Sequence, residues 1–186
     1  MKTFTARPQA IAVVASVVGA VTFPPVAGET AYTLVVWAAL CLLAAAIAVH
    51  DLATMLIPDR YTLGILLVGF AEWLFASEDV KMLAVYVCAA LLLAGSLWLF
   101  DILYERLRGQ TGLGMGDIKL LGASALLLGI SGTGVQIMLA ALAALTFILL
   151  RAIRLRRPLR AVAKVPFGTF LAPALVIVWA WLPAAG

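Results

Sequence analysis

Two aspartates, Asp51 and Asp117, lie at the edges of long apolar runs. An ionisable side chain at a membrane boundary is costly unless it is solvated or has a function. Two carboxyl groups that meet at one site can share a proton, so that one activates a water as a base and the other donates to a carbonyl oxygen. The pair therefore predicts aspartic-peptidase chemistry, which needs no cofactor.

Other catalytic chemistries have weaker candidates in this chain. The only histidine, His50, directly precedes Asp51, and sequence neighbours cannot easily face each other as a Ser–His–Asp triad requires. Two carboxylates and one histidine are a thin ligand set for zinc or for two metal ions. Cys41 and Cys88 lie in apolar runs without a CxxC partner, so we interpret them as packing residues. We expect neither a metal nor a cofactor.

Glycines surround the second aspartate. Gly112, Gly114 and Gly116 precede Asp117, and alternating glycines let the backbone turn tightly and let another segment approach closely. The apolar run that follows predicts a helix whose free N–H groups point toward this turn. Alternatively, the glycines form a helix-packing face and the aspartate only caps a helix. Asp51 on the same side of the membrane favours the catalytic interpretation.

The composition indicates which elements position these residues. Hydrophobic residues make up 65% of the chain and charged residues 12%, whereas soluble domains have roughly 25% charged residues. The mean hydropathy is +1.13. Apolar runs long enough to cross a hydrocarbon core of about 30 Å recur along the sequence. We therefore expect an all-α, polytopic membrane helix bundle, with residues 1–186 forming a single membrane-embedded domain.

Seven apolar runs predict seven transmembrane helices. Residues 1–30 would form the first span and its connection, and residues from about 31 to 183 the catalytic bundle. A basic start before an apolar run also fits a signal peptide, but Val26-Ala27-Gly28 is a poor cleavage site, so we expect the first span to be retained. The predicted spans cover about residues 9–24, 31–50, 60–76, 81–103, 115–130, 134–151 and 166–183.

The distribution of lysine and arginine predicts the orientation. With a cytoplasmic N-terminus, Lys81 alone of the 13 Lys and Arg residues falls on the outer side. Such asymmetry in short loops is a strong positive-inside signal. The same threading places Asp51 and Asp117 together on the cytoplasmic side. The basic segment 151–164 then faces anionic lipid headgroups, so we expect membrane lipids and no nucleic acid as its partners.

Three motifs resemble those of the type IV prepilin peptidases. The first resembles that family's Asp followed by Ile/Leu-Pro-Asn/Asp, the second its GxGDxKL motif, and the third its P-F/Y-G-P-F-L-A segment. The third motif departs from the family at Thr169, where proline is common. The motifs occur in family order, and the resemblance covers about residues 35–180. They read Asp51-Leu52-Ala53-Thr54-Met55-Leu56-Ile57-Pro58-Asp59, Gly114-Met115-Gly116-Asp117-Ile118-Lys119-Leu120 and Val165-Pro166-Phe167-Gly168-Thr169-Phe170-Leu171-Ala172.

This resemblance implies a membrane aspartic endopeptidase with Asp51 and Asp117 as its catalytic pair. It implies a prepilin or pseudopilin substrate whose short basic leader is cut off on the cytoplasmic side of its apolar segment, and a location in the bacterial inner membrane. Larger family members carry an N-terminal domain with paired CxxC motifs that is associated with methylation. Only a short loop separates the first two predicted spans, so we expect a short form without methyltransferase activity, similar to Tad/Flp-type peptidases.

Further residues are expected to support the site. Gly114 and Gly116 would shape the turn before the second aspartate. Pro58 and Asp59 precede the third span, where Asp59 is expected to be the N-cap. Lys119 is expected to keep the second aspartate ionised, to contact the substrate carbonyl, or only to reach the membrane surface. The candidate substrate contacts are Asp101, Glu105, Pro166, Phe167 and Gly168. The two acids, together with Asp59, would attract a basic leader.

The predicted helix ends also suggest which aspartate carries the shared proton. Asp51 is expected at a helix C-terminus, whose partial negative charge disfavours ionisation, and Asp117 at a helix N-terminus near Lys119. This predicts a resting pair that is protonated mainly on Asp51, although coupled carboxyl groups titrate together.

Two alternatives to this function stay open. The first is a small ion- or proton-coupled transporter, or a pilus-assembly scaffold, in which both aspartates relay protons through the bundle without proteolysis. The second is a presenilin-type protease, because Pro173-Ala174-Leu175 resembles the PAL motif of that family. That family places its aspartates on adjacent helices, whereas two predicted spans separate Asp51 from Asp117 here. The sequence leaves the oligomeric state open.

Overall fold

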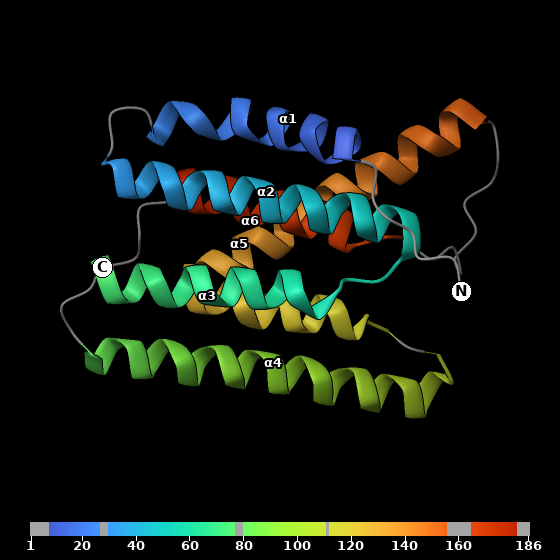
Figure 1. Cartoon of the computed structure of the whole chain (residues 1–186). Helices are drawn as coiled ribbons and strands as arrows, with labels where there is room; N and C mark the ends of the chain where they lie inside the picture. The colour runs from blue at the N-terminus through green and yellow to red at the C-terminus, as the bar shows by residue number, and fades with distance from the viewer. Residues whose placement is uncertain (1–7, 27–29, 77–79, 111, 156–164, 182–186) are drawn as a thin grey trace.

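The structure is a computed structural model that describes residues 8–26, 30–76, 80–110, 112–155 and 165–181. The described residues form an all-α bundle, as predicted, in which the long helices lie roughly along one axis (Figure 1). The helices are α1 (Pro8–Val26), α2 (Ala31–Thr54), α3 (Asp59–Ala76), α4 (Val80–Arg108), α5 (Met115–Leu155) and α6 (Gly168–Trp181).

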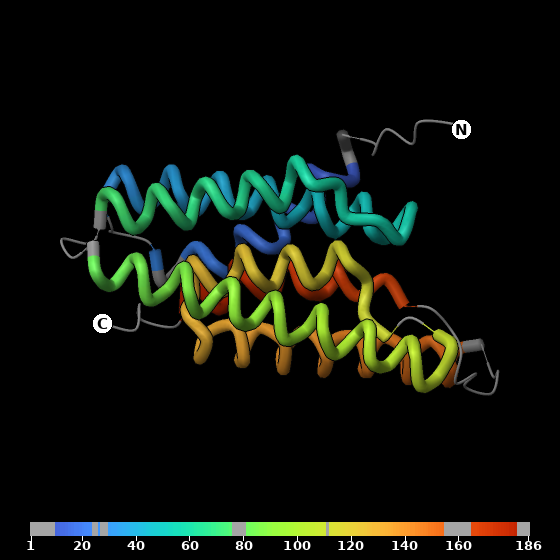
Figure 2. The backbone as a smooth tube through the Cα atoms, turned by 90° about the horizontal axis from the view of Figure 1, so that it is seen from below, coloured from blue at the N-terminus to red at the C-terminus, as the bar shows by residue number. Residues whose placement is uncertain are grey.

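Helix α5 reverses direction at Gly129. This residue has φ 71° and ψ 176°, a conformation open essentially to glycine alone. Figures 1 and 2 show that the first arm of α5, residues 115–128, runs along the bundle in one direction. The second arm, residues 130–155, runs back in the opposite direction. The reversal predicted between the spans 115–130 and 134–151 is present, but it lies at Gly129, because residues 131–134 are helical and Thr133 Oγ1 donates to Gly129 O at 2.7 Å. In apolar surroundings, even a Ser/Gly-rich segment keeps its backbone groups paired by remaining helical.

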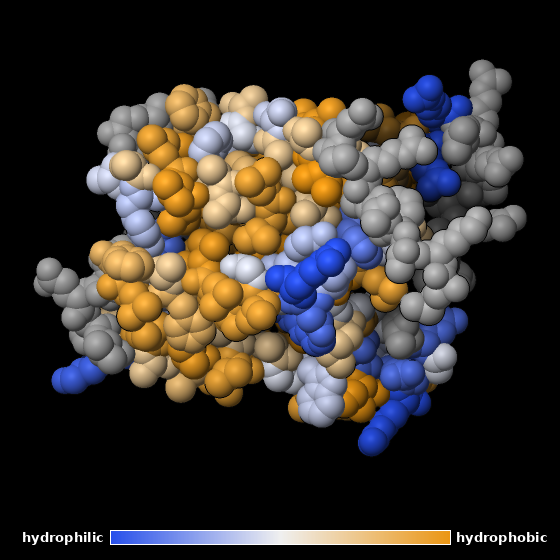
Figure 3. Space-filling view, viewed as in Figure 1, coloured by the Kyte–Doolittle hydropathy of each residue, from blue (hydrophilic) through white to orange (hydrophobic). Residues whose placement is uncertain are grey.

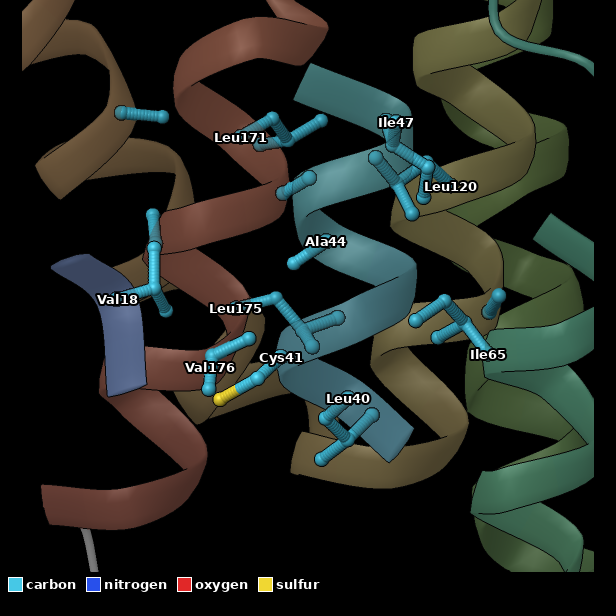
Figure 4. Close-up of a cluster of buried hydrophobic side chains, with 14 of the residues drawn as sticks. Val18, Leu40, Cys41, Ala44, Ile47, Ile65, Leu120, Leu171, Leu175 and Val176 are labelled. Atoms are coloured by element: carbon cyan, nitrogen blue, oxygen red, sulfur yellow. The ribbon is translucent and has the colours of Figure 1, made fainter. Parts of the chain in front are cut away.

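Helix α2 lies at the centre of the bundle and contacts α1, α3 and α6. Its small residues Ala44 and Ala48 are buried, so neighbouring helices approach closely. Figure 4 shows this core, in which Cys41 of α2 lies beside Val176 of α6, and Ile47 of α2 lies beside Leu120 of α5. Cys41 is a packing residue, as predicted, whereas Cys88 is exposed on α4.

The outer surface is apolar where that of a soluble protein would be polar. On α4, for example, Leu91 and Leu92 are 68% and 73% exposed, and an exposed apolar surface of this extent marks contact with lipid. Figure 3 shows a broad hydrophobic surface, with one hydrophilic cluster just right of the centre of the view and others near its edges. Three of the described helices are long and apolar enough to cross a membrane, namely Ala31–Thr54, Lys81–Arg108 and Met115–Arg154. The chain is thus a multi-pass membrane protein, and the expected seven crossings are met only in part.

The helix ends that carry the three motifs lie at one end of the bundle. The C-terminal end of α2, the start of α3, the start of α5 and the start of α6 gather on the right in Figure 1. The reversal of α5 brings its second arm back to this end (Figure 2). Residues far apart in the sequence can therefore form one site there.

Candidate active site

Asp51 lies in the last turn of α2 and is only 5% exposed. The helix ends because Met55 adopts the left-handed conformation, with φ 54° and ψ 33°, and donates its N–H to Asp51 O at 2.7 Å. This conformation costs a non-glycine residue roughly 1–2 kcal/mol. The tight end places Asp51 one turn before the chain leaves the helix.

The loop after α2 is fixed by two polar side chains. His50 Nδ1 lies 3.1 Å from Leu56 O and 2.9 Å from Thr54 Oγ1, which itself donates to His50 O at 2.8 Å. These contacts hold the chain as it turns toward Pro58. His50 thus stabilises the loop that follows Asp51, a role that its position beside an aspartate did not reveal.

Helix α6 contributes hydrogen-bond donors to Asp51. The Thr169 N–H donates to Asp51 Oδ2 at 2.8 Å, and the Thr169 hydroxyl donates to the same oxygen at 3.2 Å. Thr169 is the second residue of α6, where backbone N–H groups have no partner within the helix. The partial positive charge of this helix end therefore faces the buried carboxyl group.

Asp117 lies in the first turn of α5 and is half-buried. Its N–H donates to Gly114 O at 3.0 Å, which closes the turn formed by the glycines. Its Oδ1 is buried and has no hydrogen-bond partner among the described residues. The turn that carries Asp117 packs against Ile57, as does Gly168, which also contacts Asp51, so the two aspartates come together although 65 positions separate them in the sequence.

Ile57 connects the three motifs in space. A Cβ atom on Gly116 would lie 2.9 Å from Ile57 Cβ, and one on Gly168 would lie 2.6 Å from Ile57 Cδ1. The Gly168 Cβ would also lie 3.0 Å from Asp51 Oδ2. Only glycine lets the starts of α5 and α6 pack this closely against the loop. Sequence reasoning did not assign a role to Ile57, although it lies inside the first motif.

Asp101 holds the glycine-rich turn that precedes α5. Its Oδ1 accepts hydrogen bonds from the N–H groups of Gly112 at 2.9 Å and Leu113 at 2.8 Å. Bonds of this kind to a charged acceptor are about twice as strong as neutral ones. The expectation that Asp101 attracts a basic leader is therefore revised, since its carboxylate is engaged within the fold. Glu105, one turn further along α4, is exposed.

Asp59 and Lys119 form an ion pair at the same end of the bundle. Lys119 Nζ lies 2.7 Å from Asp59 Oδ1, and the two side chains are 46% and 77% exposed. Asp59 is the first residue of α3, so its predicted role as the N-cap is wrong. The partner of Lys119 is Asp59 rather than Asp117. An exposed pair of this kind contributes about 0–1 kcal/mol. It joins the start of α3 to the first turn of α5.

The segment before α6 sets how that helix enters the bundle. Phe167 packs against the core, and its carbonyl accepts the N–H groups of Phe170 and Leu171. Pro166 is half-buried beside it, and Gly168 is buried against Asp51. These contacts position α6, while substrate contact by these residues stays a prediction.

A separate cavity of about 570 Å³ lies between α3, α4 and the first arm of α5. Its lining is largely apolar, with Asp59 and Lys119 among its few charged residues, and neither Asp51 nor Asp117 lines it. The candidate chemistry is therefore outside this cavity, where α2, α5 and α6 meet. Among the described residues, no three His, Cys, Asp or Glu side chains gather as a metal site requires.

Comparison with known proteins agrees with this geometry. The chain is 33% identical over 170 residues to a prepilin leader peptidase/N-methyltransferase of Aeromonas salmonicida, covering 89% of this chain and 54% of that protein. It is 35% identical over 136 residues to a protein of the same description from Burkholderia pseudomallei, covering 72% and 42%. The chain thus spans about half the length of the curated relatives it matches. No solved structure matches it significantly.

The match to a family model extends over most of the chain. Residues 38–150 match the type IV leader peptidase family, a range that contains both Asp51 and Asp117. The third motif lies beyond this range but packs against Asp51 in the structure. The chain therefore belongs to the type IV leader peptidase family.

Proposed function

We propose that this chain is a membrane aspartic endopeptidase that removes the short basic leader from type IV prepilin or pseudopilin substrates. The observation that carries this proposal is the packing of the segments around Asp51 and Asp117 against the same residue, Ile57, at one end of the bundle. Membership of the leader peptidase family and the activity named for the relatives support the substrate class.

The proposed mechanism divides the roles between the two carboxyl groups. The ionised carboxylate takes a proton from a water molecule, and the resulting hydroxide attacks the scissile carbonyl carbon. The protonated partner donates its proton to the carbonyl oxygen. When the tetrahedral intermediate collapses, the first group gives the proton that it took from water to the leaving amine, and the peptide bond breaks. A hydroxyl of the intermediate returns its proton to the partner, so both carboxyl groups end in their starting states.

Hydrogen bonding favours Asp51 as the ionised member, which is the reverse of the sequence-based expectation. Two donors from Thr169 stabilise negative charge on Asp51, whereas Oδ1 of Asp117 has no partner among the described residues. The earlier expectation considered the end of α2 and overlooked the start of α6. An infrared spectrum that showed the shared proton on Asp51 at rest would contradict this assignment.

We further propose a seven-span bundle in the bacterial inner membrane, with the N-terminus and the aspartates facing the cytoplasm. Arg106 and Arg154 lie at helix ends near the aspartates, whereas Lys81 begins α4 at the opposite end, which supports this orientation. In this proposal, residues 31–183 are the catalytic bundle of a single domain. Only positions 27–30 separate α1 from α2, which supports a form similar to Tad/Flp-type peptidases.

The test is cleavage of a tagged prepilin from the same genome, co-expressed with the wild-type chain, Asp51→Asn or Asp117→Asn. We expect wild type to release the leader and each variant to lose at least about 100-fold in rate, because each removes an acid–base group. The matched control is Glu72→Gln, which makes the same acid-to-amide change on a different helix, α3. This variant should cleave normally. Cleavage that survives either Asp→Asn change at normal membrane levels would favour the transporter or scaffold.

A further inference from the structure

We infer that Thr169 is a positioning residue that fixes the carboxyl group of Asp51 for catalysis. Proline is common at this position in the family motif that the segment resembles. This inference rests on the proposed function for its catalytic readout. It deepens that function by naming a residue that acts through Asp51 rather than on the substrate itself.

The contacts of Thr169 restrict Asp51 at one oxygen. The backbone N–H and the hydroxyl both donate to Oδ2, at 2.8 Å and 3.2 Å. Two donors on the same oxygen fix the rotation of the carboxyl group, since any turn would break one of them. The other oxygen, Oδ1, then serves as the position for water and for the proton shared with Asp117.

The single hydroxyl proton of Thr169 is shared between Asp51 Oδ2 and the backbone of α2. Thr169 Oγ1 lies 3.2 Å from Ala48 O, the same distance as from Asp51 Oδ2. A threonine side chain is stiff at χ1, so it can hold this position between the two acceptors with little rearrangement. Thr169 therefore joins the start of α6 to the turn of α2 that carries the reacting carboxyl group.

A proline at position 169 could supply neither donor. Proline has no backbone N–H and no hydroxyl group. The departure of this chain from the resembling motif is thus chemically large, because it adds both hydrogen bonds to Asp51. It predicts that restoring the motif with Thr169→Pro impairs this chain instead of improving it.

The experiment compares Thr169→Val, Thr169→Ser and Thr169→Pro in cleavage of a tagged prepilin in membranes. Thr146→Val is the matched control, because the Thr146 hydroxyl also donates to a carbonyl, Leu142 O, but on the exposed side of α5. Valine keeps the shape of threonine and removes only the hydroxyl, while serine keeps the hydroxyl. The quantities measured are kcat, KM and the melting temperature of each variant.

We expect Thr169→Val to lower kcat about tenfold with KM and melting temperature near those of wild type, because one hydrogen bond to a charged group is lost. Thr169→Ser should keep kcat within about twofold of wild type, and the kcat of Thr169→Pro should be lower than that of Thr169→Val. A purely structural role would instead lower the melting temperature of Thr169→Val and leave kcat unchanged. Wild-type kcat in Thr169→Val, or full activity in Thr169→Pro, would overturn the inference.

A spectroscopic arm separates this inference from the proposed function. In Asp117→Asn protein labelled with ¹³C-aspartate, Asp51 is the remaining carboxyl group of the pair. We expect Thr169→Val to shift an aspartate carboxyl band in the infrared spectrum and Thr146→Val to leave the spectrum unchanged. If the wild type cleaves no prepilin, the proposed function fails while this band still tests the contact. An unshifted band overturns the inference whatever the cleavage result.

Discussion

At the scale of single residues, identical side chains have different roles because their surroundings differ. Three of the aspartates at one end of the bundle show this: Asp51 accepts donors from Thr169, Asp101 accepts two backbone N–H groups, and Asp59 pairs with Lys119. Only the first is buried below one-tenth exposure. The partner of each carboxylate, rather than its residue type, separates a candidate reacting group from one that holds a loop.

Asp101 provides a prediction at this scale. Asp101→Asn keeps an oxygen acceptor for the two N–H groups of the turn but removes the charge, whereas Asp101→Ala removes both. If Asp101 holds the turn, Asp101→Asn should cleave a basic-leader prepilin within about threefold of wild type, and Asp101→Ala should lose tenfold or more. Equal losses in the two variants that diminish at high salt would instead support attraction of the leader by its charge.

At the scale of the helices, close packing of their ends forms the site. The starts of α5 and α6 pack against Ile57 at glycines, where a β-carbon would meet atoms of the loop. The turn after α2 is held by Met55 in the left-handed conformation and by His50. The geometry of the site is therefore sensitive to the addition of a single methyl group at either glycine.

Gly116→Ala tests this packing, with Gly95→Ala as its control. The new methyl group of Gly116→Ala would lie 2.9 Å from Ile57 Cβ and 3.4 Å from the Ile57 backbone nitrogen, whereas nothing lies within 4 Å at Gly95. We expect Gly116→Ala to destabilise the protein by about 1–3 kcal/mol and to lower cleavage at least tenfold. Gly95→Ala should be neutral or stabilising by up to about 1 kcal/mol, as for alanine in an open helix position. Wild-type behaviour of Gly116→Ala in both thermal unfolding and cleavage would contradict the proposed packing.

At the scale of the whole molecule, the surface chemistry is divided along the bundle axis. The broad apolar surface faces lipid (Figure 3), and the last turns of α4 and α5 carry the basic residues Arg106, Arg108 and Arg154. The second arm of α5 returns to the end of the bundle that holds the aspartates because Gly129 reverses the helix. The orientation of the protein across the membrane therefore decides which compartment supplies the water and the leader.

Cysteine labelling in cells tests this orientation. In a background with Cys41 and Cys88 replaced by serine, we expect Lys81→Cys to react with a membrane-impermeant maleimide added to spheroplasts. Glu105→Cys, at the other end of α4, should react only after the membrane is permeabilised. The reverse pattern would show that the aspartates face outward. Equal labelling of both positions in sealed spheroplasts would contradict a fixed orientation.

Much of the architecture follows from the sequence alone, because apolar runs and loop charges are local properties that the bilayer selects directly. They predicted an all-α membrane bundle, both aspartates beside apolar helices and the glycine-rich turn before Asp117. The motifs extended this to the leader peptidase family, which the family comparison confirmed. The seven crossings and the roles of the two aspartates stay predictions.

Only the tertiary structure decided which groups meet. The hydrogen bonds of Thr169 to Asp51, the contact of Ile57 with two glycines and the pairing of Lys119 with Asp59 join segments far apart in the chain. Such partners depend on the relative rotation and depth of packed helices, which no local pattern specifies. The reversal predicted between the spans 115–130 and 134–151 lies earlier, at Gly129, since the Ser/Gly-rich segment beside it satisfies its backbone by staying helical.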